Sequence, residues 1–248
     1  MLVLKKKLLI LFILIIGSKC LFGWLIYADT QGSNTFNQIL INNDIKVNDD
    51  VIEFVDVFKN KGIIVGDLFV VGKEVWNDGT IVGDILGVNL ITNISGISKG
   101  NVRLITQRLE VGGEIYRNVS VITKDFVLNS SGIIDGSISV IGDKVQIDGM
   151  VSSDIRGKIN SLIITGEIKG DVNVDVEKIQ FGENGRIHGN LNYKSKNEIL
   201  MPFSKIYGKI TYEEKVPIIK RYYIKEKMTL IQALKYLFEF FIMVSKCI

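Results

Sequence analysis

Valine and isoleucine alternate with polar residues along most of this 248-residue chain, and the alternation restarts at regular intervals. Each unit opens with a glycine, has an aliphatic residue two places on, and commonly continues with a second glycine, an Asp or Asn and another aliphatic residue. The first unit reads Gly62-Ile-Ile-Val-Gly66-Asp67-Leu68. The nine units begin at Gly62, Gly79, Gly96, Gly113, Gly132, Gly149, Gly166, Gly185 and Ser204. Successive starts lie 17, 17, 17, 19, 17, 17, 19 and 19 residues apart, which indicates a solenoid.

The length of the unit identifies the class of solenoid. Helical repeats need about 33 to 47 residues, and leucine-rich repeats need about 20 to 29 residues with a leucine and asparagine signature that is missing here. Alternating apolar positions are typical of strands. We therefore expect an all-β fold, a parallel β-helix with one turn of chain per unit. About nine coils over residues 62–212, spaced by about 4.8 Å, predict a rod about 40 Å long.

Equivalent residues of successive coils stack directly on one another in such a fold, so that like residues form ladders. Two aliphatic ladders are predicted to fill the core. The first contains Ile64, Ile81, Ile115, Ile134, Val151, Ile168, Ile187 and Ile206, and the second contains Leu68, Ile85, Val102, Val119, Ile138, Ile155, Val172, Leu191 and Ile210. Ser98, Gly87 and Gly157 are the weak rungs of this core.

The glycines at the fourth place after each start are predicted to turn corners in a left-handed or otherwise strained backbone. They are Gly66, Gly83, Gly100, Gly136, Gly170, Gly189 and Gly208. The Asp or Asn that follows is expected to cap the same turn through its side chain. A calcium ladder is the alternative, but one Asp per coil is a thinner ligand set than calcium-binding repeats need. Corner chemistry is therefore the favoured interpretation.

Units of the form Gly-x-Ile/Val-x-Gly-Asp/Asn-Ile/Val at this spacing resemble those of the bactofilins, bacterial polymer-forming cytoskeletal proteins. The resemblance covers residues 62–212 and rests on the spacing and on the glycine corners. It implies a right-handed parallel β-helix that polymerises end to end without a nucleotide. The chain looks most like the members that carry a signal or anchor before the repeats and membrane segments after them.

The N-terminal region has the layout of a secretory signal, with Lys5, Lys6 and Lys7 before the apolar residues 8–16. A second apolar stretch, residues 21–27, makes an uncleaved membrane anchor the main alternative, and a lipoprotein site at Cys20 is a further one. Residues 1–28 are thus predicted to be a signal peptide or anchor, and residues 29–61 a linker and degenerate first coil. Because lysines stay in the cytoplasm, the repeat domain, residues 62–216, is expected on the extracytoplasmic side of the membrane.

Residues 217–248 read as a basic linker followed by an apolar stretch, residues 230–244, that contains Lys235 and Glu239. These two charges lie one helical turn apart, which favours an amphipathic helix on the membrane or on the last coil. A membrane segment from a truncated domain is the alternative.

Candidate catalytic and metal-binding residues are few. The two cysteines, Cys20 and Cys247, lie in the terminal segments, and the single histidine, His188, falls at an outward position typical of a surface residue. No catalytic, cofactor or metal site is predicted, since carboxylates are scattered singly over different corners. Left-handed β-helix acyltransferases keep a strict six-residue aliphatic period that fails here. The net charge of +3 without a basic stripe argues against nucleic acid.

Tyr193 and Tyr212 occupy a usual valine position in the last two coils, where they are expected to seal the core, with a sugar or filament contact as the alternative. Together these patterns predict a non-enzymatic structural or scaffolding protein of a bacterial envelope. Its expected partners are other copies of itself and the membrane. The alternative function is a monomeric exported solenoid that binds cell-wall or extracellular polysaccharide.

Overall fold

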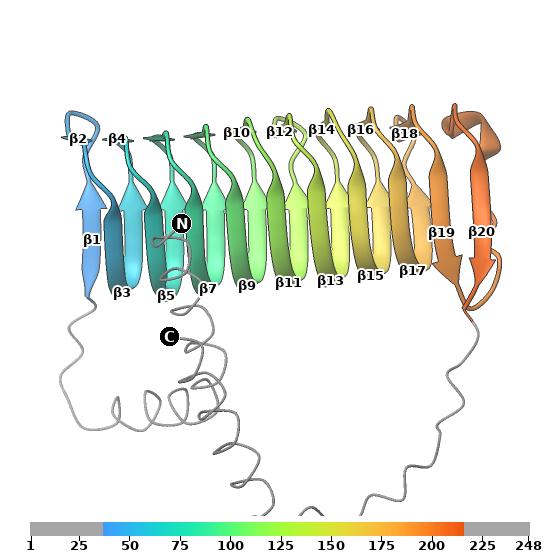
Figure 1. The fold of residues 1–248 in the computed structure, drawn as a ribbon, viewed down its shortest axis with the longest axis horizontal. Coiled ribbons are helices and arrows are strands. Elements are labelled where there is room, and N and C mark those ends of the chain that lie inside the picture. The colour runs from blue at the N-terminus through green and yellow to red at the C-terminus, as the bar shows by residue number, and fades with distance from the viewer. Residues whose placement is uncertain (1–36, 216–248) are drawn as a thin grey trace, which may run out of the picture.

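A computed structural model describes residues 37–215, which form a parallel β-solenoid of about ten turns (Figure 1). The prediction of a parallel β-solenoid is confirmed. The only helix among the described residues is the single 3-10 turn η1 (Phe203–Lys205). The predicted N-terminal signal or anchor, residues 1–28, and the predicted C-terminal helix within residues 217–248 lie outside the described residues.

The strands belong to two sheets, each with neighbouring strands in sequence order along the rod. The larger sheet contains β1 (Gln38–Ile41), β3 (Val51–Asn60), β5 (Leu68–Asn77), β7 (Ile85–Ile94), β9 (Val102–Val111), β11 (Val119–Leu128), β13 (Ile138–Ile147), β15 (Ile155–Ile164), β17 (Val172–Phe181), β19 (Leu191–Ser195) and β20 (Ile210–Glu214). The smaller sheet contains β2 (Lys46–Val47), β4 (Ile63–Ile64), β6 (Thr80–Ile81), β8 (Ile97–Ser98), β10 (Glu114–Ile115), β12 (Ile133–Ile134), β14 (Met150–Val151), β16 (Glu167–Ile168) and β18 (Arg186–Ile187).

Each long strand bends in its middle, so that a coil has three sides. In β9 the inward and outward alternation shifts at Gln107 and Arg108, which are both exposed. Thr106 and Arg108 pair with β11, whereas Gln107 is skipped. We call residues equivalent to 102–106 the first long side and those equivalent to 108–111 the second long side. The two-residue strands form the short side, and the bend between the long sides is the strand corner.

The two predicted ladders lie in the core, which also contains the inward residues of the second long side, such as Phe58, Leu109 and Phe126. The members of the two ladders are at most 2% exposed, except Ile206 at 7% and Ile210, which packs partly buried against the end of the core. Ser98 is also fully buried, and its Oγ has no hydrogen-bond partner among the described residues. The alternation of the sequence is therefore sufficient to assign the inward ladder positions.

The chain before Gly62 forms a coil with regular strand pairing. Val47 pairs with Ile64 and Val51 pairs with Leu68 in the ladders predicted for the later coils. β1 covers only the second half of β3, from Val57 to Asn60. The coil expected to be degenerate thus adds one turn to the nine predicted for residues 62–212.

The corner glycines have a different role from the predicted one, because no residue among 37–215 has a positive φ. A Cβ on Gly100 would lie 2.1 Å from the carbonyl oxygen of Gly83, the equivalent residue of the preceding coil. Glycine is needed at this corner because successive backbones approach closely, and the expectation of a left-handed turn was wrong.

The Asp and Asn side chains beside these glycines connect coils and do not cap their own turns. Oδ1 of Asp67 accepts a hydrogen bond of 2.8 Å from the backbone N–H of Asp84, one coil later. The same bond joins Asp50 to Asp67, Asp84 to Asn101, Asn101 to Asn118, Asn118 to Ser137, Asp154 to Asp171, Asp171 to Asn190 and Asn190 to Lys209. Ser137 has no side-chain amide or carboxylate, and its Oγ lies 3.0 Å from Oγ of Ser153 instead.

Candidate functional site

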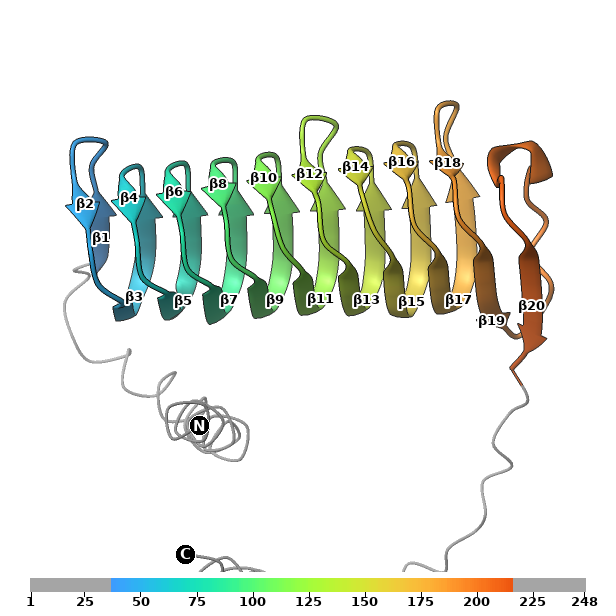
Figure 2. The same ribbon diagram turned by 45° about the horizontal axis from the view of Figure 1, so that its top comes forward.

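The longer units of 19 residues create a groove on the surface of the solenoid. Between β11 and β12 the chain uses residues 129–132, and between β17 and β18 it uses residues 182–185. The two intervening coils use only two residues at this corner, 148–149 and 165–166. The two longer loops rise above their neighbours beside β12 and β18 (Figure 2). They therefore form the two ends of a groove that is two coils wide.

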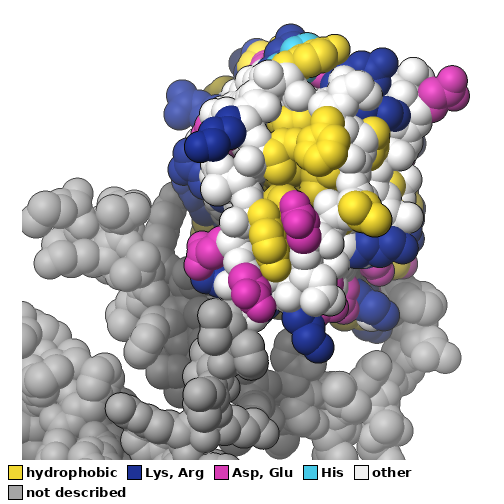
Figure 3. Space-filling model, turned by 90° about the vertical axis from the view of Figure 1, so that its right-hand side faces the viewer, with side chains coloured by type: hydrophobic (Ala, Val, Ile, Leu, Met, Phe, Trp, Pro, Cys, Tyr) yellow, Lys and Arg dark blue, Asp and Glu magenta, His cyan; other side chains and the backbone are white. Residues whose placement is uncertain are grey.

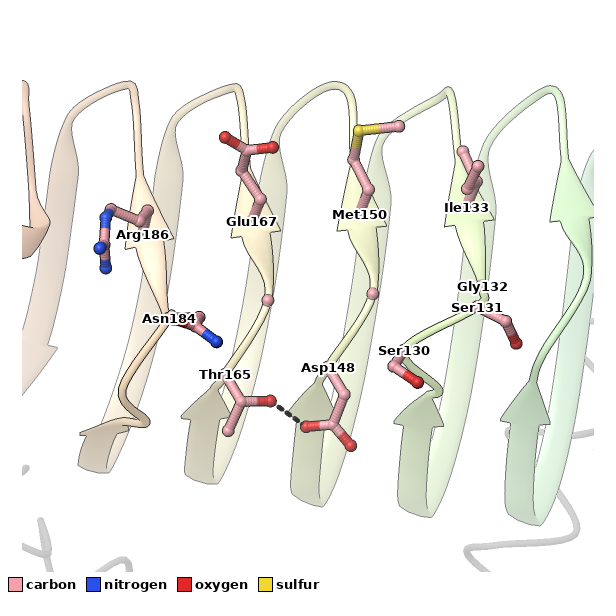
Figure 4. Close-up of a pocket in the computed structure, with 12 residues that line it drawn as sticks. Ser130, Ser131, Gly132, Ile133, Asp148, Met150, Thr165, Glu167, Asn184 and Arg186 are labelled. Carbon is pink, nitrogen blue, oxygen red and sulfur yellow. Dashed lines mark hydrogen bonds between the residues drawn. The ribbon is translucent and has the colours of Figure 1, made fainter.

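This groove is open and has a volume of about 520 Å³. Figure 4 shows Ser130 and Ser131 at one end, Asn184 and Arg186 at the other, and Asp148 beside Thr165 between them. The remaining lining residues are Gly132, Ile133, Gly149, Met150, Gly166 and Glu167. A Cβ on Gly149 or Gly166 would meet the carbonyl oxygen of the equivalent glycine one coil earlier at 2.2 or 2.1 Å, so these glycines allow the coils to pack closely beneath the groove.

The lining of the groove is mostly polar. Asp148 accepts hydrogen bonds from the hydroxyl of Thr165 and, at 2.7 Å, from Nε2 of Gln146. The Arg186 guanidinium donates to the backbone carbonyls of Glu183 and Gly185 at 3.3 and 3.2 Å. Hydroxyl, amide, carboxylate and guanidinium groups in an open groove can bind a hydroxyl-rich or peptide ligand. Its lining contains no aromatic side chain for stacking on a sugar ring.

His188 lies next to the groove, at the exposed outward position predicted for it. Its Nε2 lies 2.5 Å from Oε1 of Glu167, and its ring centroid lies 5.0 Å from that of Tyr207. Neither of these two neighbours is the serine or cysteine nucleophile of a histidine-based triad.

The carboxylates that the sequence places on adjoining coils are held apart by separate partners. Asp135 accepts a hydrogen bond from the Ser152 hydroxyl and Asp143 accepts one from the Asn160 amide. In the part of the chain that the structure describes, no three His, Cys, Asp or Glu side chains gather in a way that could hold a metal ion.

Two tyrosines stack at the C-terminal end of the rod. Tyr193 is 3% exposed, and its ring centroid lies 5.3 Å from that of Tyr212 in the last coil. The Tyr193 hydroxyl accepts a 3.2 Å hydrogen bond from the backbone N–H of Ile199. Burial, with nearby Glu214, Tyr193 and Glu198, raises the pKa of the Tyr212 hydroxyl. Hydrophobic side chains gather in the middle of this end, with charged residues around them (Figure 3).

The N-terminal end differs from the C-terminal end. Glu53 takes the inward position that Val70 holds in the next coil, while its neighbours Ile52 and Phe54 are 63% and 66% exposed. An inward carboxylate at a terminal coil is unusual for this core. The alternation in residues 51–55 places Glu53 on the inward face, but Glu53 is not among the residues predicted above.

Comparison with protein-family models, with curated proteins and with solved structures gave no match. The resemblance to bactofilins therefore rests on the repeat pattern alone. Within residues 37–215 the structure contains no helix of the length and apolar character needed to cross a membrane. The groove was not predicted above, although the 19-residue spacings that create it are visible in the sequence.

Proposed function

We propose that this chain is a non-enzymatic structural protein of a bacterial envelope, whose right-handed solenoid polymerises end to end through its terminal coils. The observation that carries the proposal is the presence of free strand edges at both ends. Among the described residues, Val51–Val55 of β3 pair only with β5, and β20 pairs only with β19. Unpaired backbone N–H and C=O groups at a sheet edge are templates for another strand.

The two ends carry equivalent ladder positions, which supports contact between copies. Ile210 continues the second ladder at one end, and Val51 begins it at the other. Parallel pairing of β20 with the free half of β3 of another copy brings Tyr212 opposite Glu53, because each lies two residues further along its strand. The tyrosine hydroxyl can then donate a hydrogen bond to the carboxylate, which offsets the cost of covering that charge.

The membrane part of the proposal comes from the terminal segments of the sequence. Three lysines before an apolar segment favour an N-terminal signal or anchor that leaves the repeats on the extracytoplasmic side. We propose this placement together with a right-handed sense of the coil.

Negative-stain microscopy of purified residues 29–216 tests the proposal, because every residue of the hydrophobic core lies between Ile39 and Tyr212. We expect filaments or strings of end-to-end rods. Single short rods at every protein concentration and salt concentration tried would exclude polymerisation through the solenoid.

The polar groove favours one alternative, a monomeric solenoid that binds cell-wall or extracellular polysaccharide. Asp148, Glu167 and Arg186 present charged hydrogen-bonding groups along its length. In that case a purified glycan binds the monomer, and Arg186→Ala weakens the binding while Lys169→Ala, outside the groove, leaves it unchanged. Failure of cell-wall glycans to bind the protein would eliminate this alternative.

A further inference from the structure

An exposed row of apolar side chains runs along the first long side. The fourth residue of each long strand points outward there, and in six successive coils it is Phe54, Val71, Val88, Ile105, Ile122 and Ile141. We call these six residues the apolar row. Phe54, Ile122 and Ile141 are 66%, 50% and 54% exposed. The row is continuous because each residue pairs in register with the next.

The apolar row is widest at its N-terminal end. In the first three coils the neighbouring outward positions are also apolar, namely Ile52, Phe69 and Leu86. Phe54 and Phe69 pack edge to face there, with ring centroids 6.3 Å apart. An apolar patch of a few hundred Å² is about the largest that a monomer usually exposes, and such patches are often functional.

The same row becomes charged in the remaining coils, where it reads Lys158, Asp175, Lys194 and Glu213. Lys194 pairs with Glu213, and Lys215 lies 2.7 Å from Asp175. The fold therefore accommodates charged residues at this outward position. The apolar residues of the first six coils do not reflect a demand of the fold.

Both ends of the described chain lie at the strand corner, which borders the apolar row. The carbonyl of Asn37 accepts hydrogen bonds from the backbone N–H groups of Asp56 and Val57, at the corner of the first complete coil. Lys215 donates its backbone N–H to Ser195, at the corresponding corner near the other end. In Figures 1 and 2 the chain accordingly enters and leaves the solenoid along the same long edge.

The chain outside the described residues indicates what this edge faces. Thirty-six residues precede the described chain and 33 follow it. Both segments contain apolar runs, which are residues 8–16 and 21–27 in the first segment and residues 230–244 in the second. If the proposed membrane association holds, attachment on both sides draws this edge towards the lipid. Leu90 and Ile91, 45% and 37% exposed, extend the apolar surface to the corner itself.

A second copy fits the apolar row less well. Five spacings of about 4.8 Å give a length of about 24 Å, and outward residues lie about 7 Å apart along a strand, so the row and its three apolar neighbours together offer on the order of 300 Å². A stable protein pair buries about 800 Å² on each partner. The neighbouring charges at the corner include Lys73, Glu74, Lys124 and Asp125, which alternate in sign and favour no anionic partner.

We infer that the apolar row contacts the lipid surface of a bilayer, so that the N-terminal half of the solenoid lies side-on against the membrane. This inference rests on the membrane association in the proposed function. The contact is apolar, and it persists at high salt where attraction to charged headgroups is screened. The charged coils from Lys158 onward remain in water.

A fluorescent label placed in the row tests this contact in the full-length protein. Cys20→Ser and Cys247→Ser remove the natural thiols, after which Ile122→Cys carries an environment-sensitive fluorophore. Lys169→Cys, at an exposed outward position next to the short side, is the matched control. Both sites are outward, and circular dichroism verifies the β-fold of each variant.

With phosphatidylcholine vesicles we expect the label at position 122 to become several-fold less accessible to aqueous iodide and to be quenched by nitroxide-bearing lipid, in low and in 1 M salt. The label at position 169 stays accessible.

Flotation of the protein with the vesicles measures membrane association independently. If the protein floats but the label at position 122 remains as accessible as the label at position 169, the inference is wrong and the proposed function still stands. Protein that does not float overturns the inference and the membrane part of the proposed function, whereas polymerisation is decided by the filament assay. Protection of position 122 that needs concentrated protein and no vesicles assigns the row to a second copy and also overturns the inference.

Discussion

The carboxylate of Asp84 accepts hydrogen bonds from both the backbone N–H and the side-chain amide of Asn101, at 2.7 and 3.0 Å, one coil further along the rod. Its other oxygen lies 2.5 Å from Nη1 of Arg103. Burial alone raises the pKa of Asp84, but the donors from Asn101 and Arg103 outweigh it and hold the pKa below the ordinary value of 3.8. The ionised carboxylate therefore links adjacent coils.

This linkage predicts a loss of stability in acid. A depressed folded-state pKa contributes stability that is fully present above the unfolded-state value near 3.8 and is lost as the pH falls through the lower folded value. Urea unfolding between pH 6 and pH 2 should show a weaker acid dependence in Asp84→Asn than in the natural protein. Asp135→Asn, at a carboxylate bonded to a serine hydroxyl, is the control. An identical acid dependence in Asp84→Asn and the natural protein would contradict the prediction.

The close approach of coils at the glycine corner predicts a steric effect. In Gly100→Ala the new Cβ meets the Gly83 carbonyl oxygen at 2.1 Å, so the two coils must move apart. We expect a loss of about 1–3 kcal/mol in the free energy of unfolding, typical of overpacking. Gly112→Ala is the matched control, because its nearest contact is Nδ2 of Asn129 at 3.5 Å. Equal stability of the two variants in urea titrations would show that the corner has room for a side chain.

Ser98 is predicted to be a site where the solenoid can be stabilised. It stacks between Ile81 and Ile115 in the core, is fully buried, and leaves its hydroxyl without a partner among the described residues. Ser98→Val replaces a buried polar group with apolar surface and should raise the free energy of unfolding by about 1–3 kcal/mol. Ser95→Val, at an exposed serine bonded to Asp78, should give no gain. A midpoint of urea unfolding that does not rise for Ser98→Val counts against this account of the ladder.

A charge in the middle of the core is predicted to prevent folding. Ile138 is fully buried and pairs with Val119 and Ile155, so the carboxylate in Ile138→Asp has no polar partner in the adjacent rungs. Ser139→Asp places the same group one residue later on the outside and should leave the β-signal in circular dichroism intact. A folded Ile138→Asp protein would contradict the dry core.

The end coils offer a prediction on assembly. Val51→Lys and Ile210→Lys place a cation at the two terminal rungs, where covering it in a contact between copies costs several kcal/mol and weakens association by orders of magnitude. Sedimentation velocity should then show monomers at concentrations where the natural protein polymerises. Thr211→Lys, at an exposed neighbour of Ile210, should polymerise normally. Circular dichroism must first show both end variants folded, and undiminished polymers from both would exclude these ends as the contact.

The sequence by itself determined the class of the fold, the inward ladders and the positions of the glycine corners. These follow from local rules, since residues of alternating character must form strands and a fixed period stacks equivalent residues. The alternation in the sequence directly assigns Ile138 and Val172 to the inward face. The buried state of Ser98 could also be read, because a solenoid keeps its register regardless of the residue at one rung.

Only the tertiary structure decided what the corners and surfaces do. The reason for Gly100 lies in the distance to Gly83 in another coil, and the partner of the Asp84 carboxylate is likewise one coil away. The groove around Asp148 and the exposed face containing Ile122 depend on which insertions and outward residues become neighbours after stacking. A periodic sequence specifies how each coil turns, whereas contacts between coils depend on the spacing between backbones, which no single repeat contains.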